Sequence, residues 1–216
     1  MSAFMLTGFG KTGMNIPAGA QSVQSDRLTA LFQQVDADLP LKLQAVRHDD
    51  FVTSVSQKSE FLPVSYGRST VTMEKCGAWL RGRSVELLKA LQTYGQSVEI
   101  SFFLTMPVAE LSGSGGDYLA NRRRWIVAIR DQRDNLKLMF NAFVAEAKIL
   151  AFAMPEPAAL GQHMQIDVCL LKQSYTNDFN SLRGSIENMA EIARVSGPFA
   201  PYNFGNAAIS DERLAA

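Results

Sequence analysis

Residues 112–124, SGSGGDYLANRRR, lie near the middle of a chain of 216 residues. A flexible glycine–serine segment is followed by Asp117, which could cap a helix, and then by three consecutive arginines. Three interpretations are open: a phosphate-binding loop, a nucleic-acid-binding patch, or a joint at which a second domain begins. The choice between them decides both the domain organisation and most of the functional argument.

The composition is that of an ordinary globular protein, with 47% hydrophobic and 19% charged residues. The length fits one large domain or two domains of about 100 residues each. Because 21 basic residues balance 21 acidic ones, any binding to nucleic acid would have to depend on a local basic patch.

Targeting and membrane signals are weak. The apolar runs are shorter than the ~20 residues of a transmembrane helix, and residues 1–10 have no basic segment ahead of their apolar residues. Cys76 and Cys169 are far apart, without metal-ligand spacing, and lie in apolar segments. We therefore expect buried thiols in a cytoplasmic protein with no membrane partner.

Residues 1–106 alternate between predicted strands and helices. Leu28, Leu31, Phe32 and Val35 have helical spacing, whereas the alternation in residues 41–45 predicts a half-buried strand. Pro63 lies in an extended segment and belongs on a sheet edge or bulge. A helix is predicted from Thr72 to Gly95, followed by a strand over residues 97–106. This order favours a small α+β domain of the ferredoxin type.

Residues 107–216 form the second predicted domain, which opens with a helix over about 117–150. Apolar residues follow a 3–4 spacing along this segment, which would be about 45 Å long. Because that length exceeds a small sheet, part of the helix should project, or pack against a partner or the first domain. A strand, a helix and a final strand follow, with a frayed tail from about 206. The predicted fold is therefore α+β, with two small, mainly antiparallel (ferredoxin-like) domains joined by a glycine–serine linker.

Candidate catalytic residues are few. His48, Asp49 and Asp50 resemble a metal cluster, but such neighbours on a helix do not face one another, and no second histidine lies nearby. A solvated cluster is the favoured interpretation. Neither cysteine lies in a glycine-rich or turn context that would suit a nucleophile. We expect a non-enzymatic protein without metal or cofactor.

The glycines at 113–116 could offer backbone N–H groups to an anion, but the segment matches no established phosphate-binding motif, and Asp117 would repel phosphate. Arg122, Arg123 and Arg124, with Trp125 nearby, point in different directions on a helix, and acidic neighbours weaken their field. Ion pairs and protein contacts are favoured over binding of nucleic acid or a small molecule. The alternative is a ferredoxin-like ligand- or nucleic-acid-binding domain that uses the Gly113–Arg124 region.

Residues 197–204, GPFAPYNF, combine two prolines that restrict the backbone with three rigid aromatic side chains. One interpretation is a final edge strand whose aromatic residues close the core of their own domain. The other is an exposed contact with a partner.

Three of these segments together resemble the gas vesicle protein GvpF/GvpL family. The first is a Leu-Pro-x-x-aromatic-Gly segment ahead of a helix, and the second is a glycine linker followed by Tyr-Leu and a basic run. The third is a terminal Gly-Pro-x-x-Pro-Tyr-x-Phe motif. The residues that match are Leu62, Pro63, Tyr66, Gly67, Tyr118, Leu119, Arg123, Gly197, Pro198, Pro201, Tyr202 and Phe204. Phe199 replaces the usual tryptophan, Ala200 replaces a proline, and the first 45 residues diverge.

The resemblance implies a two-domain α+β protein that is needed for gas vesicle assembly, as an accessory or minor shell-associated protein. It implies binding to the hydrophobic shell protein GvpA and to other gas vesicle proteins, in a chaperone-like role, at the gas vesicle and in the cytoplasm. A β-rich, apolar shell subunit would aggregate unless it were covered before assembly. The candidate partner contacts are Arg122, Arg123, Arg124, Phe199 and Tyr202.

Overall fold

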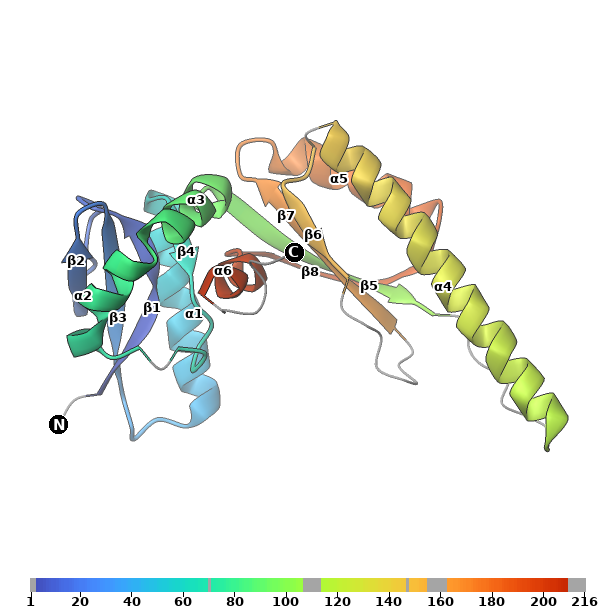
Figure 1. Ribbon diagram of the computed structural model, residues 1–216, viewed down its shortest axis with the longest axis horizontal. Coiled ribbons are helices and arrows are strands. Elements are labelled where there is room, and N and C mark those ends of the chain that lie inside the picture. Colours follow the sequence, from blue (N-terminus) through green and yellow to red (C-terminus); the bar gives the residue numbers. More distant parts are fainter. Residues whose placement is uncertain (1–2, 70, 107–113, 147, 155–162, 210–216) are drawn as a thin grey trace. The chain divides into compact units, whose positions relative to one another are not determined.

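The computed structural model describes residues 3–69, 71–106, 114–146, 148–154 and 163–209 (Figure 1). The chain divides into two compact units, each built around a four-stranded antiparallel sheet. The first unit comprises Met1–Glu99 together with Pro198–Ala216, and the second comprises Ile100–Gly197. The terminal segment from Pro198 thus belongs to the first unit, whereas the sequence placed it in a second domain over residues 107–216.

The sheet of the first unit has the strand order β2-β3-β1-β4. The strands are β1 (Ala3–Lys11), β2 (Ala20–Ser25), β3 (Leu28–Val35) and β4 (Phe61–Pro63). The helices of this unit are α1 (Leu41–Lys58), α2 (Met73–Gly82), α3 (Ser84–Tyr94) and α6 (Tyr202–Ile209). Pro63 lies on the edge strand β4, as expected of a residue that cannot donate a backbone hydrogen bond.

Strand β3 corrects the helix predicted around Leu28–Val35. Alternate residues of β3 contribute to two cores: Leu28, Ala30 and Phe32 pack in a cluster with Leu80 and Leu87 of α2 and α3, while Leu31 packs with Val52 and Val55 of α1. Residues 28–32 are therefore all buried. A strand buried on both faces lacks polar alternation, so its apolar residues can match helical spacing by chance.

Helix α1 corrects the strand predicted over residues 41–45. The alternating Leu41 and Leu43 suggested a buried face, but these side chains are 69% and 49% exposed. Pro40 immediately precedes the helix, and the carbonyl of Pro40 accepts hydrogen bonds from the amides of Leu43 and Gln44. Proline at a helix start is favourable because the missing N–H would have no partner there.

The second unit contains β5 (Ser97–Thr105), α4 (Gly116–Ala145), β6 (Ala151–Ala153), β7 (His163–Leu171), α5 (Tyr175–Glu187) and β8 (Ile192–Phe199). Its strand order is β6-β7-β5-β8. This βαββαβ sequence of elements is that of the ferredoxin-like fold, and Figure 1 shows α4 and α5 along one side of the sheet. The predicted strand over residues 97–106 is confirmed as β5.

Helix α4 ends at Ala145, earlier than the predicted 150. Its buried residues are Ile129, Leu136 and Phe140, so its first three turns have no fully buried side chain. Asp117 lies in the first turn and makes no capping hydrogen bond, which corrects its assignment as the cap. The helix follows Gly115, whose φ of 63° favours glycine. The predicted linker lies partly in residues 107–113, outside the described residues.

The predicted fraying from about 206 is not observed up to Ile209, because α6 continues to that residue. The remaining residues of the predicted tail, 210–216, lie outside the described residues.

Candidate interaction surfaces

Two of the three family-like motifs meet in the first unit. Asn206 of α6 donates to the Ser65 hydroxyl at 2.7 Å and accepts from the Ser65 amide at 3.1 Å. The neighbouring Gly205 lies so close to β4 that a Cβ on it would be 2.2 Å from the Pro63 carbonyl oxygen. The segment from Leu62 to Gly67 and the terminal segment up to Phe204 therefore belong to one packed structure.

A polar network fixes the start of α6. Asn203 donates to both oxygens of Glu99, from its backbone amide at 2.9 Å and from its side chain at 2.7 Å. The Tyr202 hydroxyl donates to an oxygen of Asp49 at 3.0 Å. Burial raises the pKa of Tyr202, and the adjacent Asp49 raises it further, so the phenol remains a hydrogen-bond donor. Phe204 is buried against Tyr94, with ring centroids 5.4 Å apart.

The terminal motif contributes to the core of its own unit, but residues 202–204 do so from helix α6 and not from the predicted final edge strand, which ends at Phe199. Phe204 closes the core of its own unit, and Tyr202 lies partly buried within it, whereas Phe199 is 42% exposed. Gly197, within β8, has a φ of 115°, a conformation that favours glycine. Pro201 supplies the carbonyl that accepts from the Gly205 amide at 2.8 Å. Of the aromatic partner candidates, Phe199 is the more accessible.

His48 is a buried histidine and not part of a solvated cluster, which corrects the sequence interpretation. It is 2% exposed, and its Nε2 lies 2.8 Å from the Val64 carbonyl oxygen. Burial lowers the pKa of His48, although the bond to Val64 and the charge of Asp49 act in the opposite direction. The neutral ring therefore donates from Nε2, and Nδ1 has no partner among the described residues.

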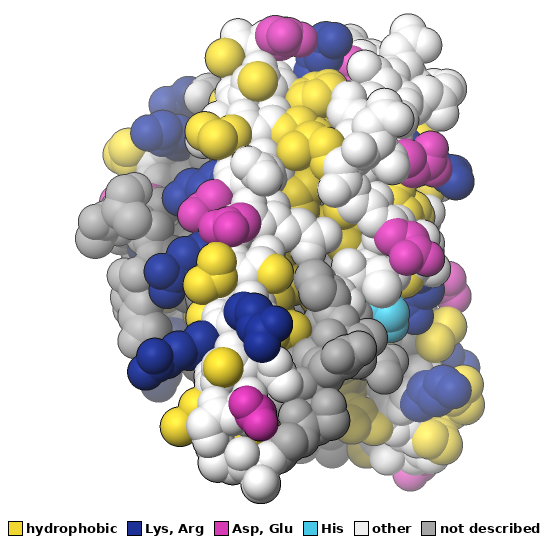
Figure 2. All heavy atoms as spheres, turned by 90° about the vertical axis from the view of Figure 1, so that its right-hand side faces the viewer, with side chains coloured by type: hydrophobic (Ala, Val, Ile, Leu, Met, Phe, Trp, Pro, Cys, Tyr) yellow, Lys and Arg dark blue, Asp and Glu magenta, His cyan; other side chains and the backbone are white. Residues whose placement is uncertain are grey.

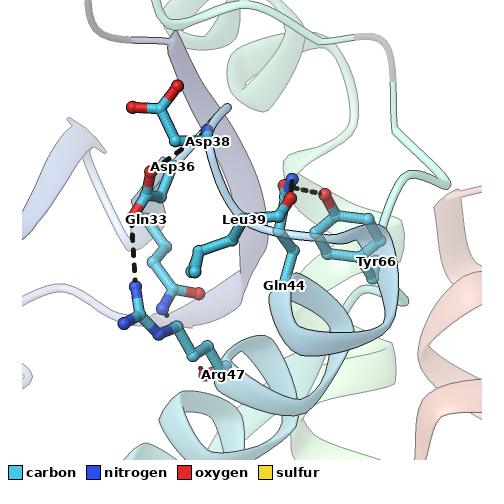
Figure 3. Close-up of polar contacts among 7 residues, drawn as sticks. All are labelled: Gln33, Asp36, Asp38, Leu39, Gln44, Arg47 and Tyr66. Atoms are coloured by element: carbon cyan, nitrogen blue, oxygen red, sulfur yellow. Dashed lines mark hydrogen bonds and ion pairs between the residues drawn. The ribbon is translucent and has the colours of Figure 1, made fainter.

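A polar groove that the sequence interpretation missed lies between the end of β3 and α1, with a volume of about 690 Å³. Arg47 donates to Asp36 at 3.3 Å in the groove, and beside it Gln44 donates to the Leu39 carbonyl at 2.7 Å. Figure 3 shows these side chains. The Tyr66 hydroxyl donates to Gln44. Since Arg47 and Asp36 are about half exposed, their ion pair contributes little. These groups satisfy one another and do not form a nucleophile–base pair.

The three consecutive arginines lie on the exposed first half of α4. Arg124 donates to the Asn121 side chain at 2.9 Å. Among the described residues Arg122 and Arg123 have no ion-pair partner, so the structural ion pairs expected there are not formed within this part of the chain. Leu119 is 56% exposed, and Tyr118 is partly buried. Figure 2 shows basic side chains beside apolar ones on this side of the second unit.

The described residues offer neither a metal-binding cluster nor a reactive thiol. None of the His, Cys, Asp and Glu side chains there forms a group of three that could hold a metal ion. Cys76 is buried, and burial raises its pKa to about 11, so the thiol is a poor nucleophile near neutral pH. The helices in this part of the chain are too short or too polar to cross a membrane.

The sequence matches no protein-family model and no curated protein. The structure is similar to two solved structures of the gas vesicle protein GvpF. For GvpF from Anabaena sp. PCC7120 the TM-score is 0.65 at 14% identity, over 95% of this chain and 96% of that chain. For GvpF from Microcystis aeruginosa the TM-score is 0.66 at 12% identity, over 94% of this chain and 98% of that chain. The GvpF/GvpL resemblance that the three motifs indicate is confirmed at the level of the fold: this chain has the two-unit α+β fold of GvpF.

Proposed function

We propose that the protein acts in gas vesicle assembly, as a non-enzymatic accessory or minor shell-associated protein. The observation that carries the proposal is the similarity to GvpF over 95% of this chain and 96% of that chain, a share too large to come from one unit alone. A match of one ferredoxin-like unit would carry little functional information, because that fold serves many functions.

The finer proposal is that the protein binds the shell protein GvpA and other gas vesicle proteins and keeps them from aggregating. The support is the exposure of apolar side chains on helices of both units. On α1 these are Leu41, Leu43 and Val46, and on α4 they are Leu119, Ile126, Val127 and Leu138, all between 42% and 69% exposed. Grouped exposed apolar residues are typical of protein contact surfaces.

The test is co-expression of the affinity-tagged full chain with GvpA, followed by purification and by measurement of soluble GvpA. We expect GvpA to co-purify and its soluble fraction to rise, because apolar shell subunits aggregate when uncovered. A tagged ferredoxin-like protein of similar size that is unrelated to gas vesicles serves as the control. Recovery of GvpA equal to that control would contradict the proposed binding.

The proposed location is the gas vesicle and the surrounding cytoplasm. Vesicles floated from lysed cells and washed should carry the protein, with a further fraction in the supernatant. Its absence from both the vesicles and the pool of soluble gas vesicle proteins would count against the proposal.

A further inference from the structure

A groove of about 720 Å³ runs between α4 and β6 in the second unit. Its apolar part is formed by Ile126 and Ile129 of α4 and by Phe152 and Met154 in and just after β6. Ile126 is 42% exposed, whereas Ile129 is largely buried. The volume lies within the range of about 300–1,000 Å³ that is usual for ligand pockets, so a short segment of another molecule has room to enter.

One wall of the groove is the edge of a sheet. β6 is the last strand in the order β6-β7-β5-β8, and it pairs with β7 from Ala151↔Cys169 to Ala153↔Asp167. Among the described residues no strand pairs with the other side of β6. An edge strand offers unpaired backbone N–H and C=O groups, to which an extended peptide can add as a further strand.

The opposite wall is basic. Arg130, Arg133 and Lys137 line the groove, and Asp134 is the acidic residue among its lining side chains. Arg133 donates to the Met154 carbonyl at 3.2 Å, so its guanidinium lies beside the end of β6. Within the described part of the chain Arg130 and Lys137 have no hydrogen-bond or ion-pair partner. Since the whole chain has zero formal net charge, this excess of positive charge is local.

The spacing of these charges suits an extended, acidic segment. Arg130 and Lys137 are two helical turns apart, or about 10 Å along α4. Alternate side chains of a strand lie on one face about 7 Å apart, and the long basic side chains can cover the difference. The intervening residues of the segment would lie on the opposite face of the strand, away from α4.

We propose that this groove binds an extended segment of a partner protein, with acidic side chains at alternate positions, that adds to the edge of β6. The inference deepens the proposed function by naming the chemistry of the segment that a partner presents, and it rests on that function only for the identity of the partner.

The probe is a fluorescein-labelled peptide of about eight alternating valine and glutamate residues, titrated with the full chain and followed by fluorescence anisotropy. We expect saturable binding that weakens as the salt concentration rises. A valine–lysine peptide should not bind, because it reverses the charge complementarity. A valine–glutamate peptide that is N-methylated at alternate residues should also fail, because it cannot complete the hydrogen bonds with β6.

The discriminating variant is Arg130→Glu combined with Lys137→Glu. Both positions are exposed, so the fold should persist, which circular dichroism checks. Affinity should fall about tenfold or more, because two weak attractions become repulsions. The matched control is Lys75→Glu combined with Lys89→Glu, which makes the same change in charge on exposed positions of α2 and α3 and should leave affinity unchanged.

The proposal is overturned if the valine–glutamate peptide does not bind, or if the groove variant binds it as tightly as the control variant. It is equally overturned if N-methylation has no effect, or if a helical acidic peptide binds more tightly than the extended one. If the peptide fails to bind while GvpA still co-purifies, the peptide-binding role of the groove is contradicted and the proposed function stands. If the peptide binds but GvpA does not co-purify, the peptide-binding role of the groove stands and the proposed binding of GvpA is contradicted.

Discussion

Replacement of Gly205 by alanine tests whether the terminal motif is seated against β4. A Cβ at this position would lie 2.2 Å from the Pro63 carbonyl oxygen, which belongs to the backbone and cannot rotate away. Helix α6 would have to move by roughly 1 Å to remove the overlap. That shift would strain the two hydrogen bonds between Asn206 and Ser65.

The expected loss of stability follows from three contributions. Overpacking of a tight site costs about 1–3 kcal/mol, and each weakened hydrogen bond costs up to about 1 kcal/mol. Alanine offsets about 1 kcal/mol of this through its better helix propensity. The free energy of unfolding of the first unit should therefore fall by about 2 kcal/mol.

Urea unfolding followed by Trp79 fluorescence measures this loss. Trp79 stacks on Phe9 in the core of the first unit, with ring centroids 5.4 Å apart. Since the chain has two tryptophans, Trp125→Phe makes Trp79 the sole reporter. With an m-value of about 1–3 kcal/mol per molar urea, the midpoint should fall by about 1 M.

The matched control is Gly184→Ala, which makes the same chemical change within helix α5. A Cβ at Gly184 would meet no atom within 4 Å, so this variant should not lower the Trp79 midpoint. If Gly205→Ala left the midpoint as high as Gly184→Ala, the packing of α6 against β4 would be refuted. The assignment of the terminal motif to the first unit would then fail as well.

Three further predictions concern buried polar groups. Burial lowers the pKa of His48, so the unfolded chain takes up this proton first as the pH falls through about 6.5. The stabilising contribution of the neutral His48 should be fully present above that pH and decline below it. His48→Gln should therefore reduce the dependence of the unfolding free energy on pH between pH 8 and 5.5, as measured by urea titrations. Tyr202→Phe removes the hydroxyl that donates to Asp49 and should cost about 1–2 kcal/mol, whereas Tyr175→Phe, the control, should cost little; equal costs would contradict the network. Cys76 is buried, and burial raises its pKa to about 11. In a Cys169→Ser variant a disulfide reagent should therefore label Cys76 only on unfolding. Rapid labelling of the native protein would contradict the burial of Cys76.

The fold class could be predicted because a strand or helix with apolar residues on one face alone has a recognisable periodicity in the sequence. β5 is such a case, since Val98, Ile100, Phe102 and Leu104 alternate with other residues over the length of the strand. β3 could not be identified, because both of its faces are buried. The strand predicted at the start of α1 is wrong because Leu41 and Leu43 are exposed. Apolar periodicity indicates secondary structure only where the apolar side chains are buried.

The interaction surfaces were less predictable for a different reason. The pairing of Ser65 with Asn206 joins residues 141 positions apart, and neither residue carries a local signal of that contact. The α4–β6 groove depends on the sheet order, which places β6 at an edge. The basic character of α4 was visible in the sequence, but the strand edge beside it was not.

Deletion of the gene in the organism that carries it tests the proposed role in gas vesicle assembly. Cells should then lose buoyancy and intact gas vesicles should disappear from electron micrographs, while the intact gene supplied on a plasmid should restore both. Deleted cells that float as well as the parent, with vesicles of normal number and shape, would contradict a role in gas vesicle assembly.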